Sequence, residues 1–213
     1  PNVYELFYAT TLGPSIYRAN PGLKPEIIDT YEIVIEQEVT PAIKVSTSGF
    51  HYTARDLINQ EVNTDGSLQF YNVNRVKSDG LELGLEINWP GFLKGDVSYT
   101  YQDTRDEQTG RWLANSPRHM IKIGARAPLF KNILFLGGQC RYMGNRLDRE
   151  GAEVGDVFIA DISLSAEYKK FTLSAAAYNV LDATYADPVS SDHLQKSILQ
   201  NGRNFWLKVG FTF

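Results

Sequence analysis

Six side chains in polar, loop-like stretches of this sequence could bind an anionic ligand. They are Arg105, Arg111, Trp112, Arg146, Arg149 and Arg203. A guanidinium group presents its N–H donors as a planar fork that fits the oxygen atoms of anions. These arginines could instead pair with acidic side chains of their own loops, and the candidates are Asp103, Asp106, Glu107, Asp148 and Glu150. Ligand binding and local ion pairing are therefore both open at this point.

No residue pattern predicts catalysis or a metal centre. The three histidines, His51, His119 and His193, are far apart and lack the spacing of metal ligands. Cys140 is the only cysteine, so an internal disulfide or a thiolate cluster is impossible. The net charge of −4 is spread along the chain and offers no basic stripe for nucleic acid. We therefore expect no catalytic residue, no metal site, no cofactor and no nucleic-acid partner.

The elements that position the candidate residues are predicted by a strict alternation of apolar and non-apolar side chains. In the last nine residues Phe205, Leu207, Val209, Phe211 and Phe213 share one face. A period of two indicates a β-strand with one apolar face. The same pattern recurs and predicts about nine strands of near bilayer-spanning length. Their ranges are 31–39, 43–58, 81–89, 93–102, 118–129, 134–142, 158–168, 171–180 and 205–213.

The connections between these strands alternate between short and long. The short turns are 40–42, 90–92, 130–132 and 169–170, and the long polar loops are 60–69, 104–117, 144–156 and 182–203. Short turns at one rim and long loops at the other are typical of an outer-membrane barrel. Aromatic residues at many strand ends fit the two interfacial girdles of such barrels. The same aromatics could also form the core of a soluble β-protein.

Residues Asn20–Glu26, followed by Tyr31-Glu32, have the pattern N-P-x-L-K-P-E…Y-E. This pattern resembles the most specific of several segments found in TonB-dependent outer-membrane receptors. The other matching segments, in family order, are Pro1–Tyr8, Asn74–Glu82, Tyr99–Tyr101 with Pro117–His119, Asn179–Tyr185, and Gly202-Arg203 before the last strand. Within Asn179–Tyr185, Val180 is a conservative departure from the Leu or Phe that is usual at this position. Together these segments extend over nearly the whole chain.

The resemblance implies a partial, all-β, transmembrane, antiparallel up-and-down β-barrel, with about nine to ten strands of a plugged barrel of about 22. Residues 1–213 would be the C-terminal portion of that barrel. We expect an extracellular loop over residues 1–26, and strands, short periplasmic turns and long extracellular loops over 27–213. Because the chain begins at Pro1 without a signal peptide, we expect a fragment or processed chain, with the plug and TonB-contacting segment upstream.

The resemblance also implies a function in the outer membrane of a Gram-negative cell. Such receptors bind a scarce ligand, typically a ferric siderophore, haem, cobalamin or another metal chelate, and import it with energy supplied through TonB. They are not enzymes. Outer-membrane lipid and lipopolysaccharide would be further partners, and lipopolysaccharide phosphates are one more possible partner for the five candidate arginines. Guanidinium groups would suit the catecholate and carboxylate oxygens of a chelate.

Two alternative interpretations stay open from the sequence. One is a smaller, complete outer-membrane barrel, such as an omptin-like protease in which the Asp192–His193 pair helps to activate water. General-base catalysis would need additional positioned carboxylates, which the sequence does not indicate. The other is a soluble β-rich protein with an adhesion or scaffold function.

Overall fold

Strands dominate the structure, a computed structural model that describes residues 1–131, 133–189 and 195–213. The long strands are β3 (Ile27–Thr40), β4 (Ile43–Val62), β5 (Leu68–Trp89), β6 (Leu93–Asp106), β7 (His119–Phe130), β8 (Leu134–Met143), β9 (Val157–Tyr168), β10 (Phe171–Tyr178) and β13 (Asn204–Phe211). The short elements are α1 (Val3–Phe7), β1 (Thr10–Leu12), β2 (Ser15–Arg18), β11 (Ala186–Pro188) and β12 (Ser197–Leu199). No helix in the described part of the chain is long and apolar enough to span a bilayer.

The described residues form two compact units. The first unit contains Pro1–Glu32, Phe50–Asp79 and Thr104–Trp112, and the second contains Ile33–Gly49, Gly80–Asp103 and Leu113–Phe213. Strands β3 to β6 contribute residues to both units. The predicted candidate side chains are therefore divided, with Arg105, Arg111 and Trp112 in the first unit and the remaining three in the second.

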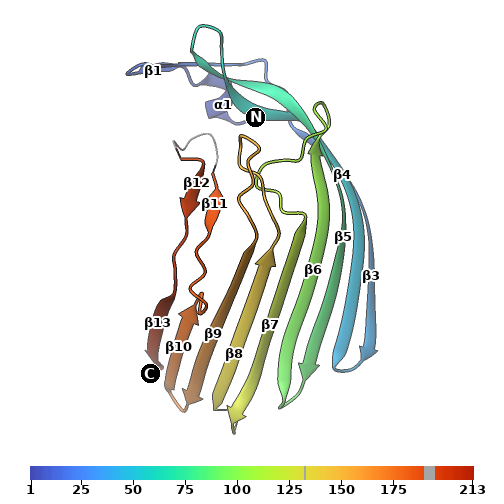
Figure 1. Cartoon of the computed structure of the whole chain (residues 1–213), viewed down its shortest axis with the longest axis vertical. Coiled ribbons are helices and arrows are strands. Elements are labelled where there is room, and N and C mark those ends of the chain that lie inside the picture. Colours follow the sequence, from blue (N-terminus) through green and yellow to red (C-terminus); the bar gives the residue numbers. More distant parts are fainter. Residues whose placement is uncertain (132, 190–194) are drawn as a thin grey trace. The chain divides into compact units, whose positions relative to one another are not determined.

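In the second unit the strands follow the order β3-β4-β5-β6-β7-β8-β9-β10-β13. Neighbours from β6 onward pair antiparallel, each with the next strand along this order. Short turns join β7 to β8 and β9 to β10 at one end of these strands, and the longer loops of β8–β9 and β10–β13 extend from the other (Figure 1). The alternation of short and long connections predicted from the sequence is confirmed here.

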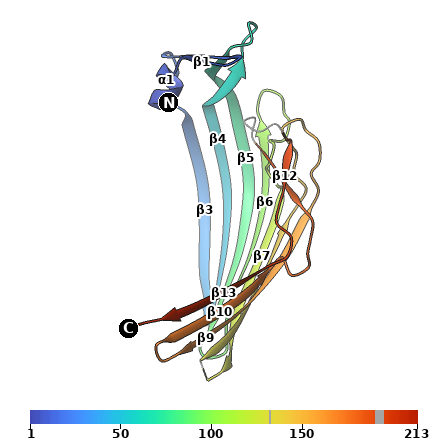
Figure 2. The same ribbon diagram turned by 90° about the vertical axis from the view of Figure 1, so that its left-hand side faces the viewer.

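One face of the terminal strand β13 carries a row of exposed apolar side chains. Phe205, Leu207 and Val209 share one face and are 77%, 68% and 71% exposed. Leu207 lies opposite Ala175 of β10, and Leu173 on the same face of β10 is also exposed. Figure 2 shows β9, β10 and β13 side by side. Transfer of large apolar side chains out of water lowers the free energy, so this row of exposed groups needs an apolar environment.

Two expected boundaries in the first unit differ from the structure. Strand β4 continues to Val62 and β5 begins at Leu68, so the loop expected over residues 60–69 is a short turn. The turn is closed by the Asn63 N–H, which donates to the Ser67 carbonyl oxygen at 2.7 Å. The Asp65 carboxylate accepts the Ser67 Oγ–H at 2.6 Å and the Ser67 N–H at 3.0 Å, and these two hydrogen bonds lower the pKa of Asp65. Polar residues that indicated a loop therefore stabilise a tight turn between two longer strands.

The segment expected to be a loop over residues 1–26 contains regular structure. Helix α1 begins at a capping box, in which the Glu5 N–H donates to Asn2 Oδ1 at 2.9 Å. Strand β2 pairs in parallel with β5 through Tyr17 and Leu68. The extracellular location expected for residues 1–26 remains a prediction. The expected loop 182–203 also contains regular structure, because β11 and β12 form a small antiparallel hairpin.

Candidate functional site

The connection between β8 and β9, residues 144–156, folds into a small hairpin that we call the β8–β9 loop. Leu147 and Glu153 form an isolated antiparallel bridge, and the Val154 N–H donates to the Arg146 carbonyl at 2.8 Å. At the base of the turn the Asp148 carboxylate accepts the N–H groups of Glu150 at 2.8 Å and Ala152 at 2.9 Å. The Ala152 N–H is the main cause of a lowered pKa at Asp148. The tip of the loop is therefore held in one conformation by an acid at its base.

Arg146 lies at the base of the β8–β9 loop and is 3% exposed. Its Nη1 donates to Asp187 Oδ1 at 2.8 Å and to Asn115 Oδ1 at 3.2 Å. Its Nη2 donates to the carbonyl of Ala186 at 3.1 Å, and the Asn115 N–H donates to the Leu147 carbonyl at 2.9 Å. One guanidinium thus joins three segments, which are the loop before β7, the β8–β9 loop and strand β11. Arg146 is thus ion-paired, but with Asp187 of another segment and not with one of the loop acids that the sequence offered as alternatives.

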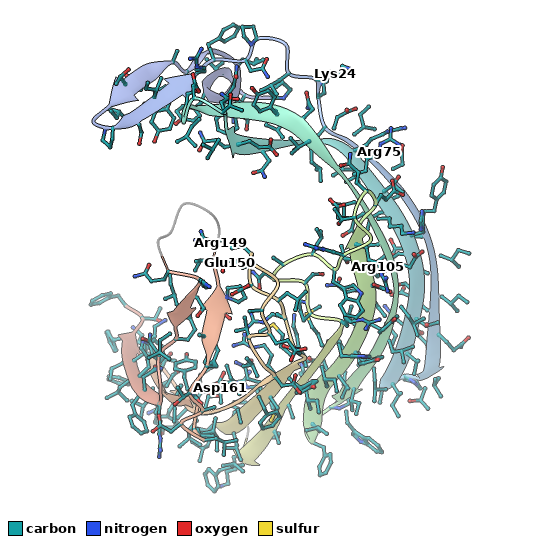
Figure 3. The ribbon with its side chains drawn as sticks, turned by 45° about the horizontal axis from the view of Figure 1, so that its top comes forward. Lys24, Arg75, Arg105, Arg149, Glu150 and Asp161 are labelled. Atoms are coloured by element: carbon teal, nitrogen blue, oxygen red, sulfur yellow. The ribbon has the colours of Figure 1, made fainter. Side chains whose placement is uncertain are left out.

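Arg149 lies at the tip of the same loop, and its side chain is exposed. Figure 3 shows Arg149 beside Glu150 at the tip, with Asp161 of β9 farther down the sheet. Glu150 Oε2 pairs with Lys196 Nζ at 2.5 Å, and this contact raises the pKa of Lys196. Both members of the pair are about half exposed. Arg146 and Arg149, although three residues apart, therefore differ fully in their access to a ligand.

Arg203 precedes β13 at a corner built by the Asn179–Tyr185 segment. Asn179 is buried in the left-handed region at φ 49°, where its side chain accepts the Ala183 N–H and donates to the Ala183 carbonyl, both at 2.9 Å. The Arg203 N–H donates to Asp182 Oδ1 at 2.7 Å, and its Nη2 is 3.7 Å from Asp182 Oδ2. The family-like motif thus turns the chain out of β10 and fixes the start of β13.

The first unit holds the remaining candidates on a hairpin that continues β6. Arg105 and Trp112 are bridge partners, and the Arg105 guanidinium carbon is 5.2 Å from the centre of the Trp112 ring. This is the geometry of a cation–π contact. The Asp106 N–H donates to the Arg111 carbonyl at 2.9 Å, and the Arg111 side chain is exposed. The hairpin therefore presents an aromatic ring and two guanidinium groups from neighbouring positions.

The most family-specific segment, Asn20–Glu26, docks onto β4 and β5 within the first unit. The Lys24 N–H donates to Asn72 Oδ1 at 2.8 Å, while Asn72 Nδ2 donates to the Lys24 carbonyl at 3.0 Å. Glu26 Oε1 accepts the Ile58 N–H at 2.8 Å. Side-chain amide and carboxylate groups therefore replace strand pairing along this segment, which gives a structural reason for its residue types.

Sequence reasoning missed the partners that organise the second unit's loops. Asn115, Asp187 and Lys196 belong to no motif, and no local spacing could have indicated their contacts. Asp192 and His193, which were considered for an omptin-like site, lie outside the described residues. Among the described residues, no cluster of His, Cys, Asp and Glu could hold a metal ion.

Comparison with known proteins gives curated relatives and solved structures. The iron-regulated outer membrane virulence protein of Vibrio cholerae serotype O1 is 24% identical over 223 residues, which cover 94% of this chain and 33% of that protein. The chain thus spans about a third of the length of this relative.

Among solved structures, the siderophore receptor PirA from Acinetobacter baumannii is similar with a TM-score of 0.75 and 16% identity, over 93% of this chain and 33% of that one. The ferric-catecholate import receptor Fiu from E. coli K12 is similar with a TM-score of 0.74 and 18% identity, over 100% of this chain and 31% of that one. At these identities the likeness shows the fold. The family model described as "TonB dependent receptor-like, beta-barrel" matches residues 1–180. The chain therefore belongs to the TonB-dependent receptor β-barrel family, and its antiparallel strands form part of a transmembrane barrel in the outer membrane.

Proposed function

We propose that this chain forms part of a receptor that captures a metal chelate outside the cell and imports it, with an iron–siderophore complex as the first candidate. The family match over residues 1–180 carries this proposal. The relatives support it, because one is named as iron-regulated, one as a siderophore receptor and one as an import receptor for ferric catecholates. The same placement favours a receptor over the omptin-like protease and over the soluble β-rich protein.

We further propose the orientation and the partners that this function requires. The short turns would face the periplasm, while the long loops and residues 1–26 would face the medium. Energy would come from TonB, through a plug that occupies the barrel lumen. The exposed apolar face of β13 and its neighbours would contact outer-membrane lipid and lipopolysaccharide.

The geometry of the loops supports a division of labour among the six candidate residues. Arg105, Arg111, Trp112 and Arg149 have accessible positions on hairpins and would contact an anionic chelate. Arg146 is buried and contacts the loop before β7 and strand β11, and Arg203 is engaged with Asp182, so these two would position the loops. Any other loop arginine that contacts the chelate would do so through the same charge-assisted hydrogen bonds to its oxygen atoms.

Growth and uptake test the transport proposal. A deletion strain would be supplied with ferric siderophores, haem or cobalamin, each as the only source of its nutrient. We expect the gene to restore growth on one metal chelate, and deletion of TonB to abolish that growth. Growth that is independent of the gene across the whole panel would contradict the proposal.

Arg149→Gln tests the ligand contact itself. Loss of one charge-assisted hydrogen bond should weaken binding of the transported chelate by about tenfold. Equilibrium binding to the purified, membrane-assembled receptor measures this change. Lys131→Gln removes the same charge at the opposite end of the sheet and serves as the matched control. Equal affinity of the Arg149 and Lys131 variants would exclude Arg149 as a contact and leave the transport proposal standing.

A further inference from the structure

Three lysines stand over aromatic rings at the short-turn end of the second unit. Lys131 Nζ is 5.3 Å from the ring centre of Phe130, and Lys169 Nζ is 5.3 Å from that of Tyr168. Lys170 Nζ is 6.0 Å from the ring centre of Phe211. All three lysines are exposed, and the three rings are 48–56% exposed. We call this set of six residues the lysine–aromatic rim.

The parts of the lysine–aromatic rim are neighbours in the sheet. The Glu167 N–H donates to the Ile133 carbonyl at 2.9 Å, which connects β9 to the turn between β7 and β8. The Thr212 N–H donates to the Lys170 carbonyl at 2.9 Å, which connects the end of β13 to the turn between β9 and β10. Figure 1 shows these turns and the end of β13 along one edge. The three ammonium groups therefore belong to one continuous strip.

Turn geometry does not account for the lysines. Lys131 and Lys169 adopt positive φ angles of 42° and 53°. This left-handed region is favourable for Gly and Asn and costs free energy for a lysine. The turn at Trp89–Phe92, at the same end of the sheet, is built without a lysine, and its two rings pack edge-to-face at 6.3 Å. A hairpin in this sheet thus forms readily without paired cations.

The charge of the rim is not neutralised by nearby acids. Segments 127–134, 168–173 and 209–213 contain no Asp or Glu. The nearest acid in sequence, Glu167, lies opposite Thr172, whereas Tyr168 lies opposite Phe171. Because adjacent cross-strand pairs point to opposite faces of a sheet, Glu167 is on the other face from Tyr168. No ion pair to these lysines occurs among the described residues.

We propose that the lysine–aromatic rim binds the phosphate headgroups of anionic phospholipids in the leaflet that faces the short turns. Aromatic rings favour the interfacial depth of a membrane, where lysine side chains extend toward the headgroups. Clustered lysines at that depth attract net-negative lipid by charge complementarity. The assignment to the periplasmic leaflet rests on the orientation proposed above, whereas the preference for anionic headgroups does not.

Lipid competition on the purified, membrane-assembled protein tests the proposal. The protein would be exchanged into micelles with equal amounts of phosphatidylglycerol and phosphatidylcholine, and retained lipids would be counted by native mass spectrometry. We expect phosphatidylglycerol to be retained preferentially. Replacing Lys131, Lys169 and Lys170 by Gln should reduce that preference by about fivefold for each lysine at low salt. The triple variant Lys94→Gln, Lys122→Gln and Lys208→Gln, which removes equal charge from the opposite face of the sheet, should keep it.

The rim variant, the salt dependence of lipid retention and the transport assay separate the possible outcomes. An unchanged preference in the rim variant, or an equal loss in the control, would overturn the proposal. If the rim variant does not assemble, the unmodified protein decides, because its preference must fall steeply between 0.05 and about 0.5 M salt. A preference that is insensitive to salt would also overturn it. A receptor that fails to transport any chelate but keeps this lipid preference would contradict the proposed function alone.

Discussion

The base and the tip of the β8–β9 loop carry the same charged residue types in opposite environments. At the base, Arg146 is 3% exposed and Asp148 is 6% exposed, and both are held by several hydrogen bonds. At the tip, Arg149 and Glu150 are exposed, and the Glu150 pair with Lys196 faces solvent. Burial, and not residue type, therefore separates the arginine that holds loop segments together from the one that is exposed to solvent.

Arg146→Met should have the largest effect on this comparison. The variant removes three hydrogen bonds from a buried charged group and leaves Asp187 without its cation, which costs about 3 kcal/mol of local stability. We expect amide hydrogen exchange at Val154 and Asn115, whose N–H groups donate across the loop base, to accelerate by about a hundredfold. Arg149→Met is the matched control at the tip and should leave both amides protected. Equal exchange rates at these two amides in the Arg146 and Arg149 variants would show that Arg146 does not hold the loop segments together.

The sequence predicted the strands of this molecule better than it predicted the base of the loop. Alternation depends on neighbours in the chain, so the faces of β13 and the short turns could be derived from local pattern alone. Arg146 finds Asn115 and Asp187 at separations of 31 and 41 residues, and no local pattern reports such contacts. Arginine in a polar loop indicates an exposed cation on average, and that average holds for Arg149 but not for Arg146.

Two chain segments that the sequence predicted as loops form a tight turn and a hairpin, again through contacts that a local pattern does not report. The turn at residues 63–67 consists of polar residues and Gly, which predict a loop, and the hairpin of β11 and β12 lies within the polar stretch 182–203. In the structure these polar groups bond to each other and to neighbouring backbone, as Asp65 does with Ser67. Family resemblance drew attention to the Asn20–Glu26 and Asn179–Tyr185 segments, but only the structure shows that both are held by side-chain hydrogen bonds.

Acid should weaken the base through Asp148, with a smaller effect than the loss of Arg146. Its pKa is lowered by N–H donors of the loop, so its contribution is complete above its ordinary value of about 3.9 and is lost as pH falls through the lowered pKa. We expect a spin label on Arg149→Cys, in a Cys140→Ala background, to stay immobile from pH 7 to 5 and to gain mobility below about pH 4. Asp148→Asn should raise mobility at neutral pH and remove the acid transition. A transition that persists in Asp148→Asn would assign it to another group.

Lys196→Gln should have the smallest effect, because it acts at the tip. The Lys196–Glu150 pair is about half exposed on both sides, so water and salt screen its attraction, and ordering two long side chains offsets much of the gain. We expect amide exchange at Val154 to change by less than about threefold, and that difference to vanish in about 0.5 M salt. The Arg146→Met effect should persist in the same salt, because its contacts are shielded from solvent. If Lys196→Gln instead loosens the loop as much as Arg146→Met does, the exposed contact is cooperative with the buried one, and the base and tip act as a single unit.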